Sequence, residues 1–284
     1  MKVLILYIVL NLFGCQQNNN KFIFTAIPDQ DTARLEQRFN KIAKYLTNEL
    51  GTEVIYLPVK SYSASVEAFK NNQVQLAWFG GLSGVKARLS VPGSRAIAQG
   101  KNDPNFKTYF IANTSTGLNI SNEFPKEIKN STFTFGSKGS TSGRLMPEFF
   151  IREYFNKAPK EVFERVGYSE NHSKTIQLVQ SGAYQFGAVN YKVWKKDLES
   201  GKVNPDMVNI IWETPDYPDY NWSIRGDVDE AFGSGFLEKV QKALLNISDK
   251  DILEQFPRES FIEATNDMYN PILETAQKVG IIQR

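Results

Sequence analysis

The order of apolar and polar positions predicts alternating strands and helices along most of the chain. Short runs of β-branched and aromatic residues, such as 22–27 and 74–79, are typical of buried strands. Between such runs lie amphipathic segments, of which residues 31–51 are the clearest: apolar residues recur every three or four positions, and Gly51 ends the pattern. A chain that alternates in this way is expected to form parallel sheets with helices on both faces, which is the α/β class.

The alternation occurs in two series. The first runs to about residue 113, and the second begins at residues 132–135 and ends with residues 208–214, the last clear strand of the pattern. The tail from Asp227 is mostly helical in pattern. Two such series in 284 residues predict two α/β lobes, each a mostly parallel sheet flanked by helices, with a ligand cleft between the lobes.

Polar and small residues collect where the predicted strands end. In open α/β sheets, ligands bind outside the carboxyl ends of the strands, so residues at these positions are candidates for a site. They are PDQD at 28–31, SYS at 61–63, WFGG at 78–81, STS at 140–142 and NY at 190–191. Their shared position is the best evidence in the sequence for a cleft.

The stretch FGSKGSTSGRLMPEFF, residues 135–150, places three hydroxyl residues between two glycines at a strand-to-helix junction. It lacks the Gly-Lys-Ser/Thr order of the nucleotide phosphate-binding loop, and Thr141 stands where a hydrolase nucleophile elbow needs serine. Unsatisfied N–H groups at a helix N-terminus carry partial positive charge and can bind an oxyanion without a lysine. Helix capping by Ser140 or Ser142 is the alternative, and it explains one hydroxyl rather than three.

His172 is the only histidine and stands where another helix is predicted to begin. A structural hydrogen bond and a second anion-facing donor are both consistent with that place. Ser140 or Ser142 with His172 and Asp219 would supply a hydrolase triad in name, but no nucleophile motif accompanies them. One histidine and one cysteine cannot form a zinc site of the usual ligand count, so no metal and no cofactor are expected.

The first twenty residues, MKVLILYIVLNLFGCQQNNN, carry a basic start, an apolar run too short to span a bilayer, and the sequence LFGC. They resemble the signal of bacterial lipoproteins, in which the cysteine becomes the lipidated first residue. We expect residues 1–14 to be a signal peptide, Cys15 the lipidation site and residues 15–20 a polar tether. An ordinary secretory signal and an uncut membrane anchor are the alternatives. In each case the protein is expected outside the cytoplasmic membrane.

The charge balance adds one exclusion. The chain has 33 basic and 31 acidic residues, a formal net charge of +2, and no basic run of the kind that nucleic acid needs. No nucleic-acid partner is therefore expected, and a charged ligand must be held by local groups rather than by the field of the whole protein.

Four stretches together resemble the phosphonate/phosphite-type substrate-binding proteins of bacterial ABC importers. They are VEAFKNNQVQLAWFG, FTFGSKGSTSGRLMPEFFIREYF, HSKTIQLVQSGAYQFGAVN and VNIIWETPDYPDY, and the resemblance covers nearly all of residues 21–284. AWFGGLSG and GSKGSTSGRLMPEFF are also similar to a branch labelled as selenate importers. The resemblance implies a type II periplasmic-binding-protein fold that closes on its ligand by a hinge. Crossings near 113–115 and 214–219 would make residues 21–113 plus 219–284 the first lobe and residues 114–218 the second.

The resemblance also implies the residues that bind the oxyanion. The matching positions are Ser140, Thr141, Ser142, Tyr62, His172 and Asp219. A gapless pairing would place Tyr220 where Asp219 is expected, so both are candidates. A further tyrosine of the family falls at Phe106, with Tyr109 three residues on, so one ligand hydroxyl is either lost or relocated.

The resemblance gives an expectation for the ligand's substituent as well. Family members that take aminoalkyl phosphonates carry a carboxylate shortly after the strand that ends here in GAVN, and the matching position is Lys192, with Tyr191 beside it. A lysine in the pocket would repel an ammonium group, while a lysine that points to solvent is the alternative. The bulk of Tyr191 would narrow the pocket in either case. Phosphite or methylphosphonate is therefore the expected ligand, with phosphate or selenate as alternatives.

These observations together predict a non-enzymatic, lipid-anchored receptor in the periplasm or an equivalent extracytoplasmic space. It is expected to be a monomer that delivers a small oxyanion to an ABC permease and its ATPase. A Ser/His hydrolase is the alternative from another class, and a sensor subunit that feeds a membrane kinase is a third.

Overall fold

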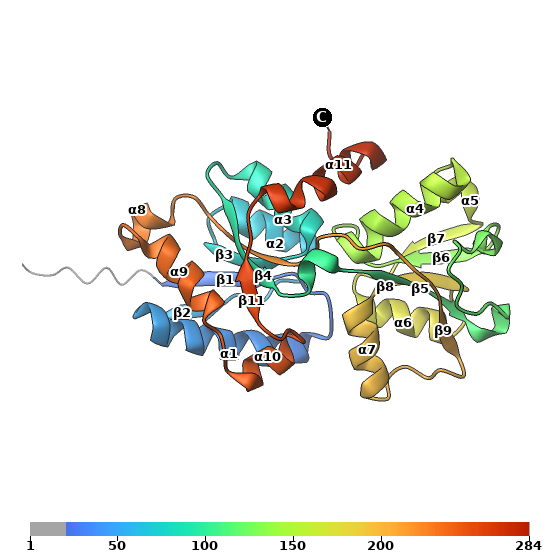
Figure 1. Ribbon diagram of the computed structural model, residues 1–284, viewed down its shortest axis with the longest axis horizontal. Coiled ribbons are helices and arrows are strands. Elements are labelled where there is room, and N and C mark those ends of the chain that lie inside the picture. The colour runs from blue at the N-terminus through green and yellow to red at the C-terminus, as the bar shows by residue number, and fades with distance from the viewer. Residues whose placement is uncertain (1–20, 284) are drawn as a thin grey trace, which may run out of the picture.

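The computed structural model describes residues 21–283 and has two lobes, each built on one sheet with helices on both faces (Figure 1). The predicted two-lobed α/β class is confirmed. The expectations for the signal peptide, Cys15 and the tether fall outside the described residues.

Lobe 1 comprises residues 21–106 and 217–283, and its sheet has the strand order β11–β4–β10–β3–β1–β2. The strands are β1 (Phe22–Ala26), β2 (Val54–Tyr56), β3 (Leu76–Phe79), β4 (Arg95–Gly100), β10 (Asn221–Ile224) and β11 (Phe261–Glu263). The helices are α1 (Thr32–Leu50), α2 (Tyr62–Lys70), α3 (Gly81–Ser90), α8 (Val228–Phe232), α9 (Phe236–Leu245), α10 (Lys250–Gln255) and α11 (Asn270–Val279).

Lobe 2 comprises residues 107–216, and its sheet has the strand order β7–β6–β8–β5–β9. The strands are β5 (Thr108–Asn113), β6 (Thr132–Phe135), β7 (Arg165–Tyr168), β8 (Phe186–Asn190) and β9 (Val208–Glu213). The helices are α4 (Met146–Phe155), α5 (Pro159–Val162), α6 (His172–Gln180) and α7 (Tyr191–Glu199).

Both sheets are mixed, which corrects the prediction of mostly parallel sheets. The βα units pair in parallel, as β1 does with β2 and β3, and as β6 does with β7 and β8. The strands that enter each lobe from the other lobe run the opposite way: β10 is antiparallel to β3 and β4, and β5 is antiparallel to β8 and β9. The pattern also missed β10 and β11, which follow the strand that it took for the last clear one.

The first crossing between the lobes differs from the predicted boundary. Residues 108–113, which were expected in the first lobe, form β5, which lies between β8 and β9 in the lobe 2 sheet. The two crossing segments pair with each other where Phe106 N–H donates to Tyr217 O at 2.9 Å and Tyr217 N–H donates to Phe106 O at 3.0 Å. This short antiparallel bridge places the crossing between the lobes at Phe106 and Tyr217.

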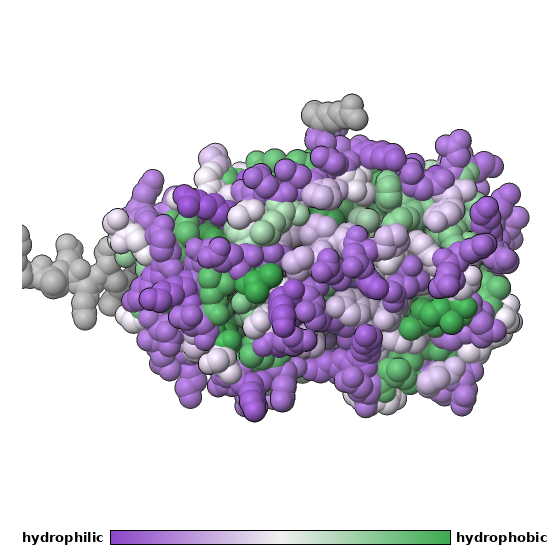
Figure 2. All heavy atoms as spheres, in the orientation of Figure 1, coloured by the Kyte–Doolittle hydropathy of each residue, from purple (hydrophilic) through white to green (hydrophobic). Residues whose placement is uncertain are grey.

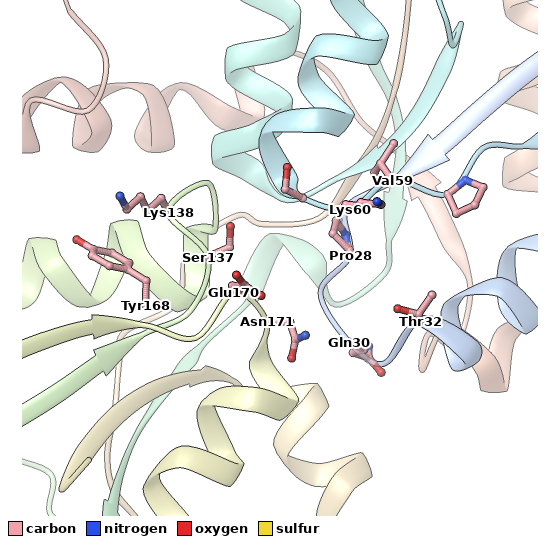
Figure 3. A pocket seen from close by; sticks show the side chains of 12 residues that line it. Pro28, Gln30, Thr32, Val59, Lys60, Ser137, Lys138, Tyr168, Glu170 and Asn171 are labelled. Carbon is pink, nitrogen blue, oxygen red and sulfur yellow. The ribbon is translucent and has the colours of Figure 1, made fainter. Parts of the chain in front are cut away.

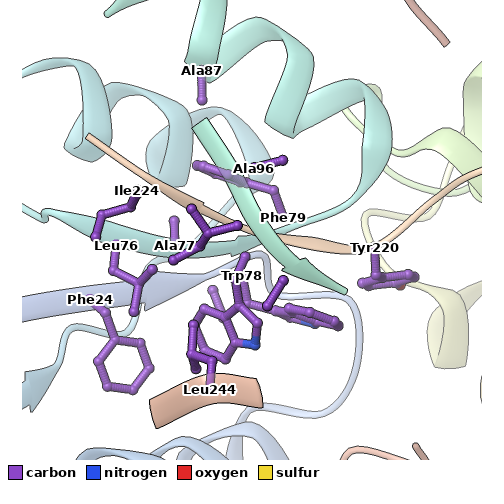
Figure 4. Packing of buried hydrophobic residues seen from close by; sticks show 14 of the residues in the cluster. Phe24, Leu76, Ala77, Trp78, Phe79, Ala87, Ala96, Tyr220, Ile224 and Leu244 are labelled. Atoms are coloured by element: carbon purple, nitrogen blue, oxygen red, sulfur yellow. The ribbon is translucent and has the colours of Figure 1, made fainter. Parts of the chain in front are cut away.

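The core of lobe 1 is aromatic around Trp78 and Trp222, whose ring centroids lie 5.2 Å apart. Figure 4 shows Phe24, Leu76 and Trp78 pointing into this cluster, while Tyr220 lies at its edge toward lobe 2. The strand ends that carry polar residues are thereby fixed to a rigid core.

Hydrophilic side chains cover most of the face shown in Figure 2, with hydrophobic ones in small groups. Within residues 21–283, no helix combines the length and the apolar character that a membrane crossing requires. Nor do three or more His, Cys, Asp or Glu side chains gather there in a way that could hold a metal ion.

Candidate oxyanion site between the lobes

Six of the predicted site residues lie in the interface between the lobes. They are Tyr62, Ser140, Thr141, Ser142, His172 and Asp219, and each is at most 2% exposed. Hydrogen bonds join the lobes beside them, because Leu82 N–H of lobe 1 donates to Thr141 Oγ1 (3.0 Å) and Ser83 Oγ donates to the Gly139 carbonyl (2.9 Å). The two lobes are therefore closed on one another.

The turn that carries the three hydroxyl residues follows β6. Its two ends touch through glycines: Gly136 N–H donates to Gly143 O at 2.7 Å, and a Cβ on Gly136 would lie 3.2 Å from Gly143 Cα. The chain then runs through a π-helix, Thr141–Leu145, into α4. Single π-turns of this kind are frequent at functional sites. The close glycine contact folds the turn back so that residues 140–142 stand at the interface.

The three hydroxyl groups have different roles. Ser140 Oγ accepts a hydrogen bond from Gly143 N–H at 2.9 Å and so caps the helix. Thr141 Oγ1 accepts the bond from Leu82 described above, and Ser142 Oγ lies 3.4 Å from His172 Nε2. Capping therefore accounts for Ser140 alone, whereas Thr141 and Ser142 face the other groups of the site.

Four helices begin at the site, two from each lobe. They are α2 at Tyr62, α3 at Gly81, the π-helix at Thr141 and α6 at His172. A helix N-terminus carries roughly half a positive charge and presents free N–H donors. Since none of the predicted site residues is lysine or arginine, the attraction for an anion comes mainly from these helix ends.

His172 is neutral and donates through Nε2. Its Nδ1 accepts a hydrogen bond from Asn190 N–H at 3.3 Å, which leaves the ring proton on Nε2, the nitrogen that faces Ser142. Burial lowers the pKa of His172 to about 4, so the ring stays uncharged at neutral pH. His172 can therefore donate a hydrogen bond to an anion without bringing a charge.

The arrangement of His172 and Ser142 does not fit the hydrolase alternative. A serine nucleophile gives its proton to a histidine nitrogen that carries a lone pair, and the third residue of a triad contacts the other nitrogen. Here Nε2 carries the proton, and a main-chain N–H rather than a carboxylate faces Nδ1. This geometry suits hydrogen-bond donation and not general-base catalysis.

Asp219 faces the other residues of the site, whereas the hydroxyl of its neighbour Tyr220 donates to Asp29 Oδ2 at 2.7 Å. Asp219 Oδ1 accepts a hydrogen bond from Gly81 N–H at 2.8 Å, and the Thr141 hydroxyl lies close to the same carboxyl. Burial raises the pKa of Asp219 to about 7, so the carboxyl changes its charge near neutral pH. It can therefore accept a proton from a ligand or donate one to it.

Tyr62 contributes a hydroxyl that the protein itself leaves almost unused. Burial raises its pKa well above the usual value. Among the described residues the hydroxyl has no hydrogen-bond partner of normal geometry, although Ser140 lies close enough to influence its pKa. A buried hydroxyl without a partner is unfavourable, and a ligand oxygen would supply one.

Aromatic rings lie next to the site, around the crossing at Phe106. The ring centroid of Phe106 lies 4.9 Å from that of Tyr191 and 5.3 Å from that of Tyr220. Phe106 brings no hydroxyl, and Tyr109 does not replace it at this place, because its hydroxyl lies beside Glu213. The hydroxyl expected at this position is thus absent, and an apolar surface stands in its place.

Lys192 lies at the interface rather than in solvent or among the residues described above. Its Nζ donates to the Pro257 carbonyl at 3.2 Å and lies 5.2 Å from the ring centroid of Tyr191. Burial, followed by the charge of Arg258, lowers the pKa of Lys192 to about 8. Its position therefore matches neither of the two sequence-based alternatives fully.

Sequence reasoning missed several buried polar residues beside the site. Asp29 and Asn190 were recognised only as polar residues at strand ends, and Arg258 was not singled out. Arg258 Nε donates to Asp103 Oδ2 at 2.9 Å, and its guanidinium lies 5.1 Å from the ring centroid of Tyr220. Its partners are distant in sequence, and its own neighbours include Glu254, Glu259 and Ser260, so no local pattern distinguished it.

A cavity of about 690 Å³ opens just outside the buried site, between the lobes (Figure 3). Pro28, Ser61 and Asn171 line it, and each directly precedes a buried residue in sequence: Asp29, Tyr62 and His172. Lys60 of lobe 1 and Lys138 of lobe 2 also line this cavity. Its place at the junction of both lobes makes it the vestibule of the site.

Two lobes joined by paired crossings, with helix ends and neutral donors facing each other across a closed interface, are the arrangement expected of a binding protein for a small anion. The chain matches the family model described as ABC transporter, phosphonate, periplasmic substrate-binding protein over residues 24–269, and it belongs to that family. It is thus a periplasmic substrate-binding protein of the phosphonate-type ABC transporters.

Individual relatives agree with the family. The chain is 42% identical, over 91% of its length and 89% of the relative's, to PhnD1 of Prochlorococcus marinus (strain MIT 9301), described as a probable ABC transporter phosphite binding protein. The crystal structure of that PhnD1 with methylphosphonate has a TM-score of 0.89 and 40% identity, and covers 93% of this chain and 100% of that one. A binding protein of a phosphonate transporter from Pseudomonas aeruginosa shares the fold at 18% identity (TM-score 0.78, covering 91% and 86%).

Proposed function

We propose that this protein binds phosphite or methylphosphonate in the buried site and delivers it to an ABC permease and its ATPase. One observation carries the choice of ligand: uncharged donors and four helix ends surround a carboxyl whose pKa lies near neutrality. An anion that keeps one titratable P–OH group matches Asp219. The methylphosphonate complex of the Prochlorococcus relative supports the same choice.

Asp219 separates phosphorus oxyanions from sulfate and selenate. Sulfate and selenate carry no proton at neutral pH, so they can hydrogen-bond only to the protonated form of Asp219, which becomes scarcer as the pH rises through about 7; an ionised Asp219 would face two negative charges without a hydrogen bond between them. A phosphonate or phosphite can place its P–OH against the carboxylate, which turns repulsion into a charge-assisted hydrogen bond. Selenate is therefore the weaker of the alternative ligands, and phosphate remains the stronger one.

The aromatic side of the site accounts for the preference over phosphate. Phosphite has a hydrogen, and methylphosphonate a methyl group, where phosphate has its fourth oxygen. We propose that this substituent lies against Phe106 and Tyr191, where a fourth oxygen would lose its hydrogen bonds to water without replacement. The hydroxyl absent at Phe106 is then part of the specificity.

The proposals for the membrane anchor, the oligomeric state and the absence of catalysis rest on the sequence. We propose that Cys15 is lipidated and holds the protein at a membrane beside its permease, that the protein acts as a monomer, and that it catalyses no reaction. The tautomer of His172 supports the last point, because a proton on Nε2 prevents Ser142 from losing its own proton to that nitrogen.

A calorimetric panel of the mature protein tests the proposal. Phosphite and methylphosphonate should bind most tightly, phosphate more weakly, and sulfate and selenate more weakly still. Tightest binding of sulfate or selenate would show that Asp219 does not set the choice. Turnover of phosphate or acyl esters by the same preparation would show that the protein is an enzyme.

A further inference from the structure

Asn190 connects the histidine of the site to the opposite lobe. It is the last residue of β8 and is 2% exposed. Its main-chain N–H donates to His172 Nδ1 (3.3 Å), and its side-chain Nδ2 donates to the Tyr220 hydroxyl (2.9 Å). Its Oδ1 accepts from the N–H groups of Lys192 (2.8 Å) and Val193 (3.3 Å), and so caps α7. Both polar atoms of the side chain are thereby engaged.

The hydrogen bonds continue from Tyr220 back to His172. The Tyr220 hydroxyl donates to Asp29 Oδ2 at 2.7 Å, and the Asp29 carbonyl accepts from His172 N–H at 3.1 Å. Asp29, Tyr220, Asn190 and His172 therefore form a closed ring, which we call the interlobe ring. Asp29 and Tyr220 belong to lobe 1, and Asn190 and His172 belong to lobe 2, so two of the ring's four connections cross the interface.

Each hydroxyl and amide in the ring has a single consistent direction. Tyr220 has one proton and gives it to Asp29, so the hydroxyl must accept from Asn190. The two connections within a lobe, Tyr220 to Asp29 and Asn190 to His172, do not depend on closure. The two that cross the interface exist only while the lobes are closed, because each joins a residue of lobe 1 to a residue of lobe 2.

We propose that Asn190 is a positioning residue that couples lobe closure to the binding of the anion, without touching the anion. Its main-chain N–H fixes the histidine tautomer within lobe 2. Its side-chain amide then docks on Tyr220 as the lobes close. The anion accepts a hydrogen bond from His172 Nε2, and the interlobe ring holds the same histidine in place. Both therefore favour the closed state of the protein.

This inference rests on the proposed function, because it needs an anion whose affinity can be measured. Asn190→Ser is the sharpest variant: serine caps a helix as well as asparagine does and keeps the main-chain N–H, but it is too short to reach Tyr220. Phosphite and methylphosphonate should both bind about three- to tenfold more weakly, by the same factor, as expected for one lost buried hydrogen bond. Their order of affinity should not change, and the loss should lie mainly in faster dissociation.

A second variant and a control complete the test. Tyr220→Phe removes the other partner, so adding Asn190→Ser to it should weaken binding no further, whereas independent effects would add. Asn113→Ser is the matched control: Asn113 also caps a short helix in lobe 2, and its Nδ2 donates to the Val179 and Gln180 carbonyls within the same lobe. The control should bind both anions like the wild type.

Because His172 is the only histidine, a ¹⁵N NMR spectrum of the ring nitrogens reports its tautomer without assignment. The proton should remain on Nε2 in Asn190→Ser, and a switch to Nδ1 would overturn the assigned role of the main-chain N–H. Unchanged affinity in a folded Asn190→Ser protein, or a changed ratio between the two anions, would overturn the coupling. If the wild type binds neither anion, the proposed function itself fails.

Discussion

Arg34 Nη1 of α1 lies 3.0 Å from Asp197 Oδ1 of α7, and this ion pair joins lobe 1 to lobe 2 at the edge of the site. The Asp197 side chain is 2% exposed and also accepts from Ser173 Oγ at 2.8 Å, directly beside His172. The carboxylate therefore stays fixed in lobe 2, and only the arginine contact depends on closure.

Arg34→Gln should weaken the binding of every anion by a common factor of about five, because one partly exposed ion pair contributes about 1 kcal/mol to the closed state. Titration calorimetry of the variant with phosphite and methylphosphonate checks this result. Lys41→Gln is the control, since it breaks the pair between Lys41 and Asp251 (2.8 Å) on the same helix but within lobe 1. Equal losses in both variants would mean that the Arg34 pair does not act through closure.

Ser140→Ala should lower the stability of the protein, whereas Ser142→Ala should lower its affinity for the anion. Ser140 caps the helix through Gly143 N–H, so its removal should lower the free energy of unfolding by about 1 kcal/mol. Ser142→Ala should leave stability nearly unchanged but lower affinity about tenfold or more, because a hydrogen bond to a charged oxygen contributes roughly 1.5–3 kcal/mol. Urea unfolding and calorimetry on both variants separate the two effects. Normal affinity in Ser142→Ala would remove this serine from the site.

The different roles of Ser140 and Ser142 could not be predicted from the sequence alone. Three hydroxyls between two glycines predicted an anion site, and the six predicted residues do lie together. Their separate roles depend on Leu82 and His172, which belong to other segments. The strand Asn221–Ile224 was missed for a related reason, because its four residues pair with strands far away in sequence. Local patterns cannot specify such partners.

Asp219 should make the free protein less stable as the pH rises. Burial raises its pKa from 3.8 to about 7, so its stabilising contribution is complete below the unfolded value and is lost as the pH rises through the folded one. The fall is at most about 4 kcal/mol, from roughly 1.4 kcal/mol for each pH unit. Asp219→Asn should abolish it, which unfolding at several pH values between about 4 and 7 would measure.

His172 should contribute a pH dependence of stability with the opposite sign to that of Asp219, and His172→Gln should remove it. Its pKa is lowered from 6.5 to about 4, so its contribution is present above the unfolded value and is lost as the pH falls through the folded one. The two groups partly cancel in the wild type over this range. If stability of Asp219→Asn still falls with rising pH as in the wild type, the carboxyl is not buried as described.

A phosphonate whose substituent carries an amine should bind poorly. The nearest buried cation beside the aromatic side is Arg258, and the carboxylate of Asp103 is already bonded to it. An ammonium group placed there would lie beside the Arg258 cation, and its only acceptor without a partner would be Asp103 Oδ1, on a carboxylate that Arg258 already pairs with. We expect 2-aminoethylphosphonate to bind at least about 2–3 kcal/mol more weakly than methylphosphonate in calorimetry. Tighter binding of the amine would mean that the substituent points elsewhere, for instance into the vestibule.

A crystal structure of the protein with methylphosphonate would locate the bound anion directly. We expect phosphonate oxygens within hydrogen-bond distance of Ser142 Oγ, His172 Nε2 and the Tyr62 hydroxyl, a P–OH against Asp219, and the methyl group against Phe106 and Tyr191. A phosphonate found instead in the vestibule between Lys60 and Lys138, with the buried site filled only by water, would contradict this expectation.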